Sequence, residues 1–362
     1  MDVKLEKWHK CQVDKELLKE LSKKSDLKGF QHVSVFFGLL VLTGILAYIF
    51  WGSIWGIFWI LIYGNIYCFA NPLWHETGHK TAFKSNHLNE FFYYISCYMA
   101  CFEPVRWRYS HFIHHGNTYS TENPYDHEIE YGNDLKKTLP NLIREIIPFG
   151  NLIFFNKDIT FEIIKHSLGI ETKVMKDCIP EKAKNKSILI SRVYVVIWIS
   201  IILFSIYINS LLPIMYFVLP HFYGKTLHKL VAFTQHAGLA RNIKDHRLTS
   251  REMYLNPILS FLYWKMEYHL THHMFPTVPS YNLDKLHHHI KDQLPRTNTG
   301  LIDAYKEIIP ALMRQSKEEG YYIKKDLHLP LFPRSSTPSR ALSYAVPCVP
   351  LPHTLSPVRN VL

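Results

Sequence analysis

The chain has 362 residues, a formal net charge of +11 and six cysteines. No two cysteines have C-x-x-C spacing, so the sequence contains neither a disulfide framework nor a rubredoxin-type iron site. The positive charge does not indicate nucleic-acid binding, because the basic residues flank apolar runs and form no single patch. The 22 histidines are unusual, and their clustering is mainly a signal of metal binding.

Membrane segments begin early in the chain. Residues 1–32 are charged and rich in lysine, and we expect a short amphipathic helix there. An apolar run at 33–51 is long enough to cross about 30 Å of hydrocarbon at about 1.5 Å per residue. Only Gly-Ser separates it from a second apolar run at 54–70. The pair predicts a transmembrane hairpin.

A second hairpin is predicted at 188–208 and 211–231, where only Asn-Ser joins the two runs. Both hairpin loops lack Lys and Arg, which are concentrated in the N-terminus, in 71–187 and after about residue 225. Because positive charge marks the cytoplasmic side, we expect both termini and all histidine clusters to face the cytosol. The membrane would be the endoplasmic reticulum or a bacterial inner membrane.

The remaining segments complete the expected fold. Residues 91–104 are apolar but too short to cross, so they favour a helix that lies in the interface or dips partly into the membrane. The Pro- and Ser-rich tail, 326–362, is expected to be disordered. The prediction is an all-α integral membrane protein with four transmembrane helices in two hairpins. A cytosolic helical cap, built from 71–187 and 232–325, would cover them.

The first motif that carries chemistry is "WHETGH". His75, Glu76 and His79 form H-E-x-x-H, which on a helix is typical of a zinc metalloprotease with the glutamate as general base. This spacing alone does not distinguish a protease from another metal enzyme. We refer to His75 and His79 as the first box.

Two further motifs share the spacing H-x-x-H-H. The second box is "HFIHH" and the third is "HLTHH". Positions i, i+3 and i+4 share one helix face, so the three imidazoles of a box can converge on metal. With the first box, eight histidines are available, enough for two metal ions, and His236 in "TQH" is a ninth candidate. Imidazole suits Fe, Zn, Cu and Ni alike, so the ligands do not name the metal.

The runs "HETGHKTAFKSNHLNE", "RWRYSHFIHHGNT", "TQHAG" and "YHLTHHMFP" resemble the membrane fatty acid desaturases of the acyl-lipid type. The similarity spans roughly 33–290 and includes the order and spacing of the boxes, so that 33–325 is expected to be a desaturase-like domain. It implies a cytosolic di-iron site that uses O2 to remove hydrogen from an unactivated C–H bond. The iron ligands it implies are His75, His79, His111, His114, His115, His236, His269, His272 and His273.

The resemblance also implies partners. The substrate would be a fatty acyl lipid or an acyl thioester, and the outcome a double bond. The sequence has neither the His-Pro-Gly-Gly haem motif of a fused cytochrome b5 nor the cysteines of a ferredoxin. An external electron donor of one of these two types is therefore implied.

Several neighbouring residues have more than one interpretation. Glu76 is expected to orient a ligand imidazole rather than to act as a proteolytic base. Asp126 and Glu128 would do the same or lie in a solvated loop. His287, His288 and His289 are adjacent in sequence and are expected at the surface.

Three alternative functions differ in what they require. A di-iron hydroxylase, epoxidase or ketolase, acting on an alkyl, sterol-like or carotenoid substrate, would share the site, and the placement of the substrate would decide the outcome. A membrane zinc protease would need the first box but neither H-x-x-H-H motif. A non-catalytic relative would be expected to have lost ligands, and no box histidine is missing.

Overall fold

The computed structural model describes residues 7–122, 124–129, 135–150, 159–318 and 320–327. Within these residues the chain is helical and has no β-strand, only an isolated bridge between Met253 and Asn298. The expected all-α class is confirmed for this part of the chain. The predicted disordered tail lies outside the described residues, apart from its first two.

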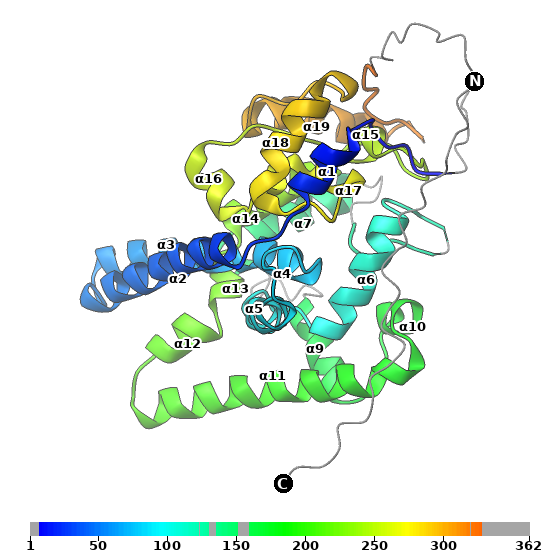
Figure 1. Cartoon of the computed structure of the whole chain (residues 1–362). Helices are drawn as coiled ribbons and strands as arrows, with labels where there is room; N and C mark the ends of the chain where they lie inside the picture. Colours follow the sequence, from blue (N-terminus) through cyan, green and yellow to red (C-terminus); the bar gives the residue numbers. More distant parts are fainter. Residues whose placement is uncertain (1–6, 123, 130–134, 151–158, 319, 328–362) are drawn as a thin grey trace, which may run out of the picture. The chain divides into compact units, whose positions relative to one another are not determined.

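Two long apolar helices pack against each other near the N-terminus (Figure 1). They are α2 (Asp26–Ile49) and α3 (Ile54–Cys68), and serine side chains cap the N-termini of both. After one residue, α3 continues into α4 (Ala70–Gly78), and together they form a 25-residue candidate membrane span. The first box therefore lies at the end of a membrane-length helix.

The exposed surface of α2 has the composition expected of a helix in lipid. Its buried face comprises Val33, Phe36, Leu40, Thr43 and Ala47. Its remaining surface is equally apolar and exposes Val41, Leu42, Ile45, Tyr48 and Ile49. An exposed helix that is apolar on all sides is stable in hydrocarbon rather than in water.

Three helices in the described ranges are long and apolar enough to cross a membrane, whereas four were expected. Besides α2 and the α3–α4 pair, the third is α11 (Glu181–Tyr207), which contains most of the predicted span 188–208. The segment 211–231 does not form the expected continuous helix. It is divided into α12 (Leu212–Phe217), α13 (Pro220–Tyr223) and α14 (Thr226–Ala232).

Prolines and a glycine account for this division. Pro213 and Pro220 occupy the first turns of α12 and α13, where the missing N–H does no harm, but a proline ends any helix that precedes it. Gly224 ends α13 and lies so close to the backbone of Gly64 on α3 that a Cβ would be 2.1 Å from it. Hydropathy alone does not detect either effect.

The segment 71–187, which was expected to form part of the helical cap, contains the second box. α5 (Asn86–Met99) covers most of the segment 91–104 that was expected to form an interfacial helix, and it packs against α4. α6 (Pro104–Gly116) follows, and the side chain of its N-cap residue, Glu103, accepts hydrogen bonds from two backbone N–H groups. The second box lies toward the other end of α6, in its C-terminal half.

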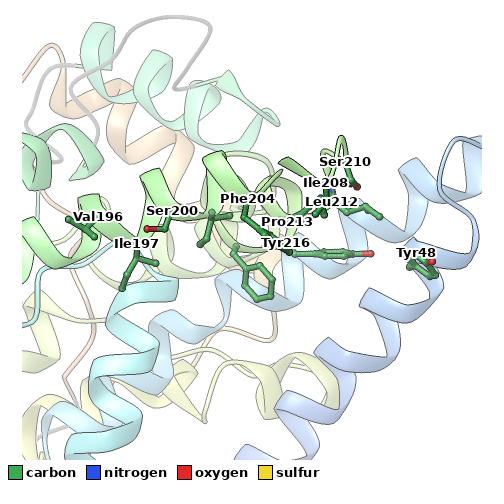
Figure 2. A pocket seen from close by; sticks show the side chains of 12 residues that line it. Tyr48, Val196, Ile197, Ser200, Phe204, Ile208, Ser210, Leu212, Pro213 and Tyr216 are labelled. Atoms are coloured by element: carbon green, nitrogen blue, oxygen red, sulfur yellow. Dashed lines mark hydrogen bonds between the residues drawn. The ribbon is translucent and has the colours of Figure 1, made fainter. Parts of the chain in front are cut away.

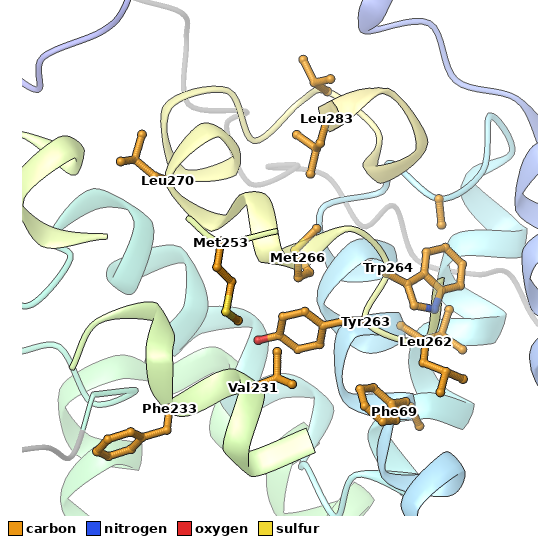
Figure 3. Close-up of a cluster of buried hydrophobic side chains, with 14 of the residues drawn as sticks. Phe69, Val231, Phe233, Met253, Leu262, Tyr263, Trp264, Met266, Leu270 and Leu283 are labelled. Carbon is orange, nitrogen blue, oxygen red and sulfur yellow. The ribbon is translucent and has the colours of Figure 1, made fainter. Parts of the chain in front are cut away.

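The other helices belong to the same unit. They are α1 (Lys15–Leu21), α7 (Leu135–Ile146), α9 (Ile159–Ser167), α10 (Lys173–Cys178), α15 (His246–Thr249), α16 (Pro257–Leu262), α17 (His269–Met274), α18 (Ser280–Ile290) and α19 (Leu301–Gln315). The largest buried apolar cluster extends from α2 and α3 through α14, α16, α17 and α18 to α19, and Figure 3 shows part of it. It includes Trp264 and Tyr263, and it fixes the position of α17, which carries the third box.

Candidate metal centre

The three boxes and His236 meet in the interior of the protein. Their nine histidines form two groups, and within each group one ring nitrogen from every member lies within 4.8 Å of the others. The five-histidine group comprises His75, His79, His111, His115 and His272. The four-histidine group comprises His114, His236, His269 and His273. Every histidine expected to bind metal is present in one of the two groups.

The second and third boxes divide between the two groups in opposite ways. On α6, His111 and His115, which are four residues apart, belong to the five-histidine group, and His114 belongs to the other. On α17 it is the i+3 residue, His272, that belongs to the five-histidine group. Each helix therefore supplies both groups, because i and i+4 lie almost above each other whereas i+3 points to one side.

The Nε2 atoms in each group converge. In the five-histidine group, the Nε2 atoms of His79 and His111 are 2.9 Å apart, and those of His272 and His115 are 3.3 Å apart. In the four-histidine group, the Nε2 of His269 lies 2.9 Å from that of His236 and also 2.9 Å from that of His273. Ligand atoms around one metal ion at about 2.0–2.1 Å are spaced in this way.

The partners of the opposite ring nitrogens fix the tautomers. The Nδ1 of His111 lies 2.9 Å from a Glu128 oxygen, and the Nδ1 of His114 lies 2.9 Å from an Asp126 oxygen. The Nδ1 of His236 lies 2.7 Å from the carbonyl oxygen of Thr249. These partners only accept hydrogen bonds, so Nδ1 carries the proton and Nε2 of the neutral ring has a lone pair.

Converging lone pairs repel one another unless a cation lies between them, so the donor set fits a metal ion in each group. The pKa shifts of two rings agree with this, whereas for His114 the effect of burial is outweighed by the Asp126 carboxylate, which raises the pKa of this ring. Burial lowers the pKa of His236 to about 3. Burial, together with the imidazoles of His115 and His269, lowers the pKa of His273 well below its ordinary value. Both rings are therefore neutral near pH 7 and able to bind metal.

The two groups are adjacent. The rings of His115 and His273, one from each group, stack with centroids 4.3 Å apart and an interplanar angle of 25°. Those of His111 and His114 are 5.6 Å apart. The arrangement can hold two metal ions side by side.

Two of the three predicted orienting carboxylates contact box histidines. Asp126 accepts a hydrogen bond from the backbone N–H of Tyr119 as well as from His114. Although burial opposes it, the His114 imidazole lowers the pKa of Asp126 to about 2. Glu128 binds His111 and Ser110. Both carboxylates are buried or nearly so, which excludes the alternative of a solvated loop.

The prediction for Glu76 was wrong. Its side chain is fully buried, but it accepts a hydrogen bond from the backbone N–H of Ser280 at the start of α18 and contacts no box histidine. On the helix, Glu76 is rotated by about 100° from His75 and by about 60° from His79, so its side chain lies to one side of the face that carries them. It joins α4 to α18 instead.

The expectation of a surface position for His287 was also wrong, although His288 and His289 are exposed. His287 is buried, and its Nδ1 lies 2.8 Å from Glu252. The other Glu252 oxygen accepts hydrogen bonds from the backbone N–H and the hydroxyl of Thr271, in the third box. Sequence analysis missed Glu252, because nothing in its neighbourhood repeats or has a motif spacing.

A cavity of about 230 Å³ lies beside the two groups. Box histidines from both groups line it, together with the aromatic side chains Trp74, Phe102, Trp107 and Tyr263. Trp107 stacks on Phe102 at 3.8 Å and packs against Trp74 of the first-box helix at 5.5 Å. Charged side chains also line it, among them Arg106, Glu145, Lys225 and Lys229, so the cavity next to the ring nitrogens has both aromatic and charged walls.

A larger hollow lies elsewhere. It has a volume of about 620 Å³, and apolar residues of α11 and α12 line most of it, with Tyr48 of α2 (Figure 2). None of its lining residues is a histidine or an acid. It belongs to the apolar helices and not to the candidate metal centre.

Comparison with known proteins agrees with this geometry. The family model described as "Fatty acid desaturase" matches residues 49–305, which is more than half of the chain and includes all three boxes and His236. No individual curated protein matches. With its candidate membrane helices and paired histidine groups, the chain belongs to the fatty acid desaturase family.

Proposed function

We propose that this protein is a membrane di-iron desaturase, which uses O2 to introduce a double bond into a fatty acyl chain. The observation that supports this most directly is the pair of adjacent all-histidine groups. A single zinc site needs three or four protein ligands, whereas nine converge here. Family membership and the membrane-length helices favour an apolar chain as substrate.

Iron is proposed because the reaction requires redox chemistry, which zinc does not provide. Two bound iron ions would supply, from O2, the oxidising power needed to remove hydrogen from an unactivated methylene. The residues proposed to hold them are His75, His79, His111, His115 and His272 for one ion, and His114, His236, His269 and His273 for the other.

Other residues of the chain would prepare the site. Asp126 and Glu128 hold His114 and His111 with their Nε2 lone pairs directed into the groups. Trp74, Trp107 and Phe102 would form the wall of the cavity that accepts an apolar acyl chain, beside the charged side chains of the other walls. The cavity has a volume of about 230 Å³, which would accommodate a segment of the substrate's acyl chain rather than all of it.

We infer that the chain crosses the membrane four times. The second box precedes α11 and the third box follows it, yet their histidines share both groups. The number of crossings between them must then be even. If α11 crosses once, the return must use α12, α13 and α14, which is acceptable in a membrane where broken helices are buried in protein. The distribution of Lys and Arg favours a cytosolic site.

The proposal can be tested by metal analysis of detergent-purified protein, with Mössbauer spectroscopy of an iron-57 preparation. About two irons per chain are expected, and His114→Ala should lose iron. His288→Ala, which changes an exposed histidine outside both groups, is the matched control and should retain it. One zinc per chain, retained in His114→Ala and lost in His75→Ala, would overturn the proposal in favour of a protease.

The outcome of the reaction requires a second measurement. Lipids from cells with the active protein and with the His114→Ala variant would be compared by mass spectrometry. A desaturase removes two hydrogens from the acyl chain, whereas a hydroxylase or an epoxidase adds an oxygen. If the product contained added oxygen, the proposed iron site would stand, but the reaction would be a hydroxylation or an epoxidation rather than a desaturation.

A further inference from the structure

The segment before α1 lies close to the candidate metal centre. In Figure 1 it runs beside α15. The backbone N–H of His9 donates to the carbonyl of Lys244, at 3.0 Å. Gln12 and Gln293 exchange two hydrogen bonds, of 2.7 and 2.8 Å. The segment is therefore held in place at several points.

Trp8 connects this segment to the second box. Its indole Nε1 donates to the carbonyl oxygen of Gly116, at 2.9 Å. Gly116 directly follows His115, a member of the five-histidine group. The half-buried indole is thus partly open to solvent on one side and bonded next to the candidate metal centre on the other.

Trp8 also connects to the other group. Its ring stacks on His246, with centroids 4.0 Å apart and an interplanar angle of 5°. His246 is only 3% exposed, and its ring lies 5.0 Å from that of His273 in the four-histidine group. The Nδ1 of His246 is buried without a hydrogen-bond partner. A chain of aromatic rings in contact therefore leads from the surface to the candidate metal centre.

The surface around Trp8 is basic. Lys7 and Lys10 flank it in sequence, and Lys244 bonds the same segment through its backbone. All three lysines are exposed. Such a surface attracts an acidic partner and increases the association rate.

We propose that this surface, which comprises Lys7, Trp8, Lys10 and Lys244, is the docking site of an acidic one-electron carrier protein. The Trp8 and His246 rings would carry its electrons to His273. The inference rests on the proposed function, because each desaturation consumes one O2, two electrons and two protons. Two hydrogens leave the substrate and two waters are released. Each docked donor is oxidised by one electron, and the iron pair gains that electron.

The first test changes the charge of the surface. Reduced cytochrome b5 and reduced plant-type ferredoxin serve as acidic probes, and their binding to the iron-loaded protein in nanodiscs is measured at several salt concentrations. In the Lys10→Glu/Lys244→Glu variant, binding of the true donor type should weaken about tenfold at low salt. Its dependence on salt should become weaker. The matched control is Lys176→Glu/Lys182→Glu, which reverses two exposed charges on α10 and α11 and should bind normally.

The second test concerns the electron path. Stopped-flow reduction of the iron centre by saturating donor should slow several-fold in Trp8→Leu and recover in Trp8→Phe, which restores an aromatic ring. Reduction by methyl viologen radical, a small cation that does not need the docking surface, should be unchanged in both. A packing role for Trp8 alone would instead lower iron content or slow both reductants equally.

The outcomes separate this inference from the proposed function. Normal donor binding and donor-dependent reduction in all these variants, with iron present, would overturn the docking site and leave the desaturase proposal intact. Absence of a redox metal from the wild-type protein would overturn both.

Discussion

The two histidine groups differ in how firmly their members are oriented. In the four-histidine group, three rings have a partner for Nδ1: Asp126 for His114, the Thr249 carbonyl for His236, and Thr118 for His273. In the five-histidine group, the Nδ1 atoms of His75, His115 and His272 have no hydrogen-bond partner. The group with fewer ligands therefore has more rings that are oriented by a hydrogen bond to Nδ1. Ligand number and ligand orientation thus compensate each other across the site.

The largest expected effect is on metal content. His236→Ala leaves three imidazoles in the four-histidine group, whereas His79→Ala leaves four in the other. We expect His236→Ala to retain about one iron per chain and His79→Ala to retain nearly two, because the loss of one of four ligands should weaken iron binding more than the loss of one of five. Elemental analysis of the purified variants measures this directly. Equal losses in the two variants would show that the groups do not differ in redundancy.

A residue that supports both groups should affect both. Glu252 anchors α17, which contributes to each group, and Glu252→Ala leaves His287 and Thr271 without their buried acceptor. We expect the free energy of unfolding to fall by about 3 kcal/mol. Glu318→Ala, which removes an exposed ion pair with Arg314, should cost less than about 0.5 kcal/mol. Denaturant unfolding in detergent measures both, and a Glu252→Ala value as small as the control's would contradict the anchoring role.

Substitution of the two orienting carboxylates, Asp126 and Glu128, should lower iron affinity by different amounts. Asp126→Asn allows an amide N–H to face the Nδ1 of His114, which favours the tautomer that cannot bind metal through Nε2. Iron affinity of the four-histidine group should fall roughly 10- to 100-fold. Glu128→Gln should have a smaller effect, because the five-histidine group contains four other imidazoles besides His111, the ring that Glu128 orients. Chelator competition measures the affinities, and a larger effect of Glu128→Gln would reverse the comparison.

The smallest expected effect belongs to Thr118, whose neutral side chain contacts a ring of the four-histidine group. The Thr118 hydroxyl donates to the His114 carbonyl and lies 3.2 Å from the Nδ1 of His273. Thr118→Val keeps the shape and removes this partner, so iron affinity should fall roughly two- to tenfold. Thr121→Val, at an exposed position in the same loop, serves as the control in the same titration.

The nine histidines singled out from the sequence all lie in the two groups, and they could be recognised because their signal is local. Positions i, i+3 and i+4 are neighbours on any helix, so a box can be recognised without knowing the fold. Spacing could not reveal that His114 belongs to a different group from His111 and His115, or that His272 belongs to a different group from His269 and His273. That division depends on how α6 and α17 face each other, which is a tertiary property.

The wrong predictions share a cause. Glu76 and His287 were interpreted from their sequence neighbours, but their partners are Ser280 and Glu252, which are far away in sequence. His246 has no motif spacing and was not singled out. A buried polar residue finds whichever partner the fold provides, and one sequence does not specify it.

The membrane segments show the limit of counting apolar residues. Three of the four predicted spans fall within long helices, whereas 211–231 is divided at Pro213, Pro220 and Gly224. Composition measures whether a segment is soluble in lipid, but not whether its backbone remains continuous.

The length of the nearly continuous α3–α4 helix pair bears on how deep in the membrane the candidate metal centre lies. His75 follows Ile54 by 21 positions, which is about 30 Å along a helix and equals the thickness of the hydrocarbon layer. With Ile54 at the far boundary, the ring nitrogens lie level with the near boundary, where lipid tails meet head groups. An acyl chain would then have to rise only slightly out of its leaflet to be modified. Membranes of different thickness would offer different carbons to the same site.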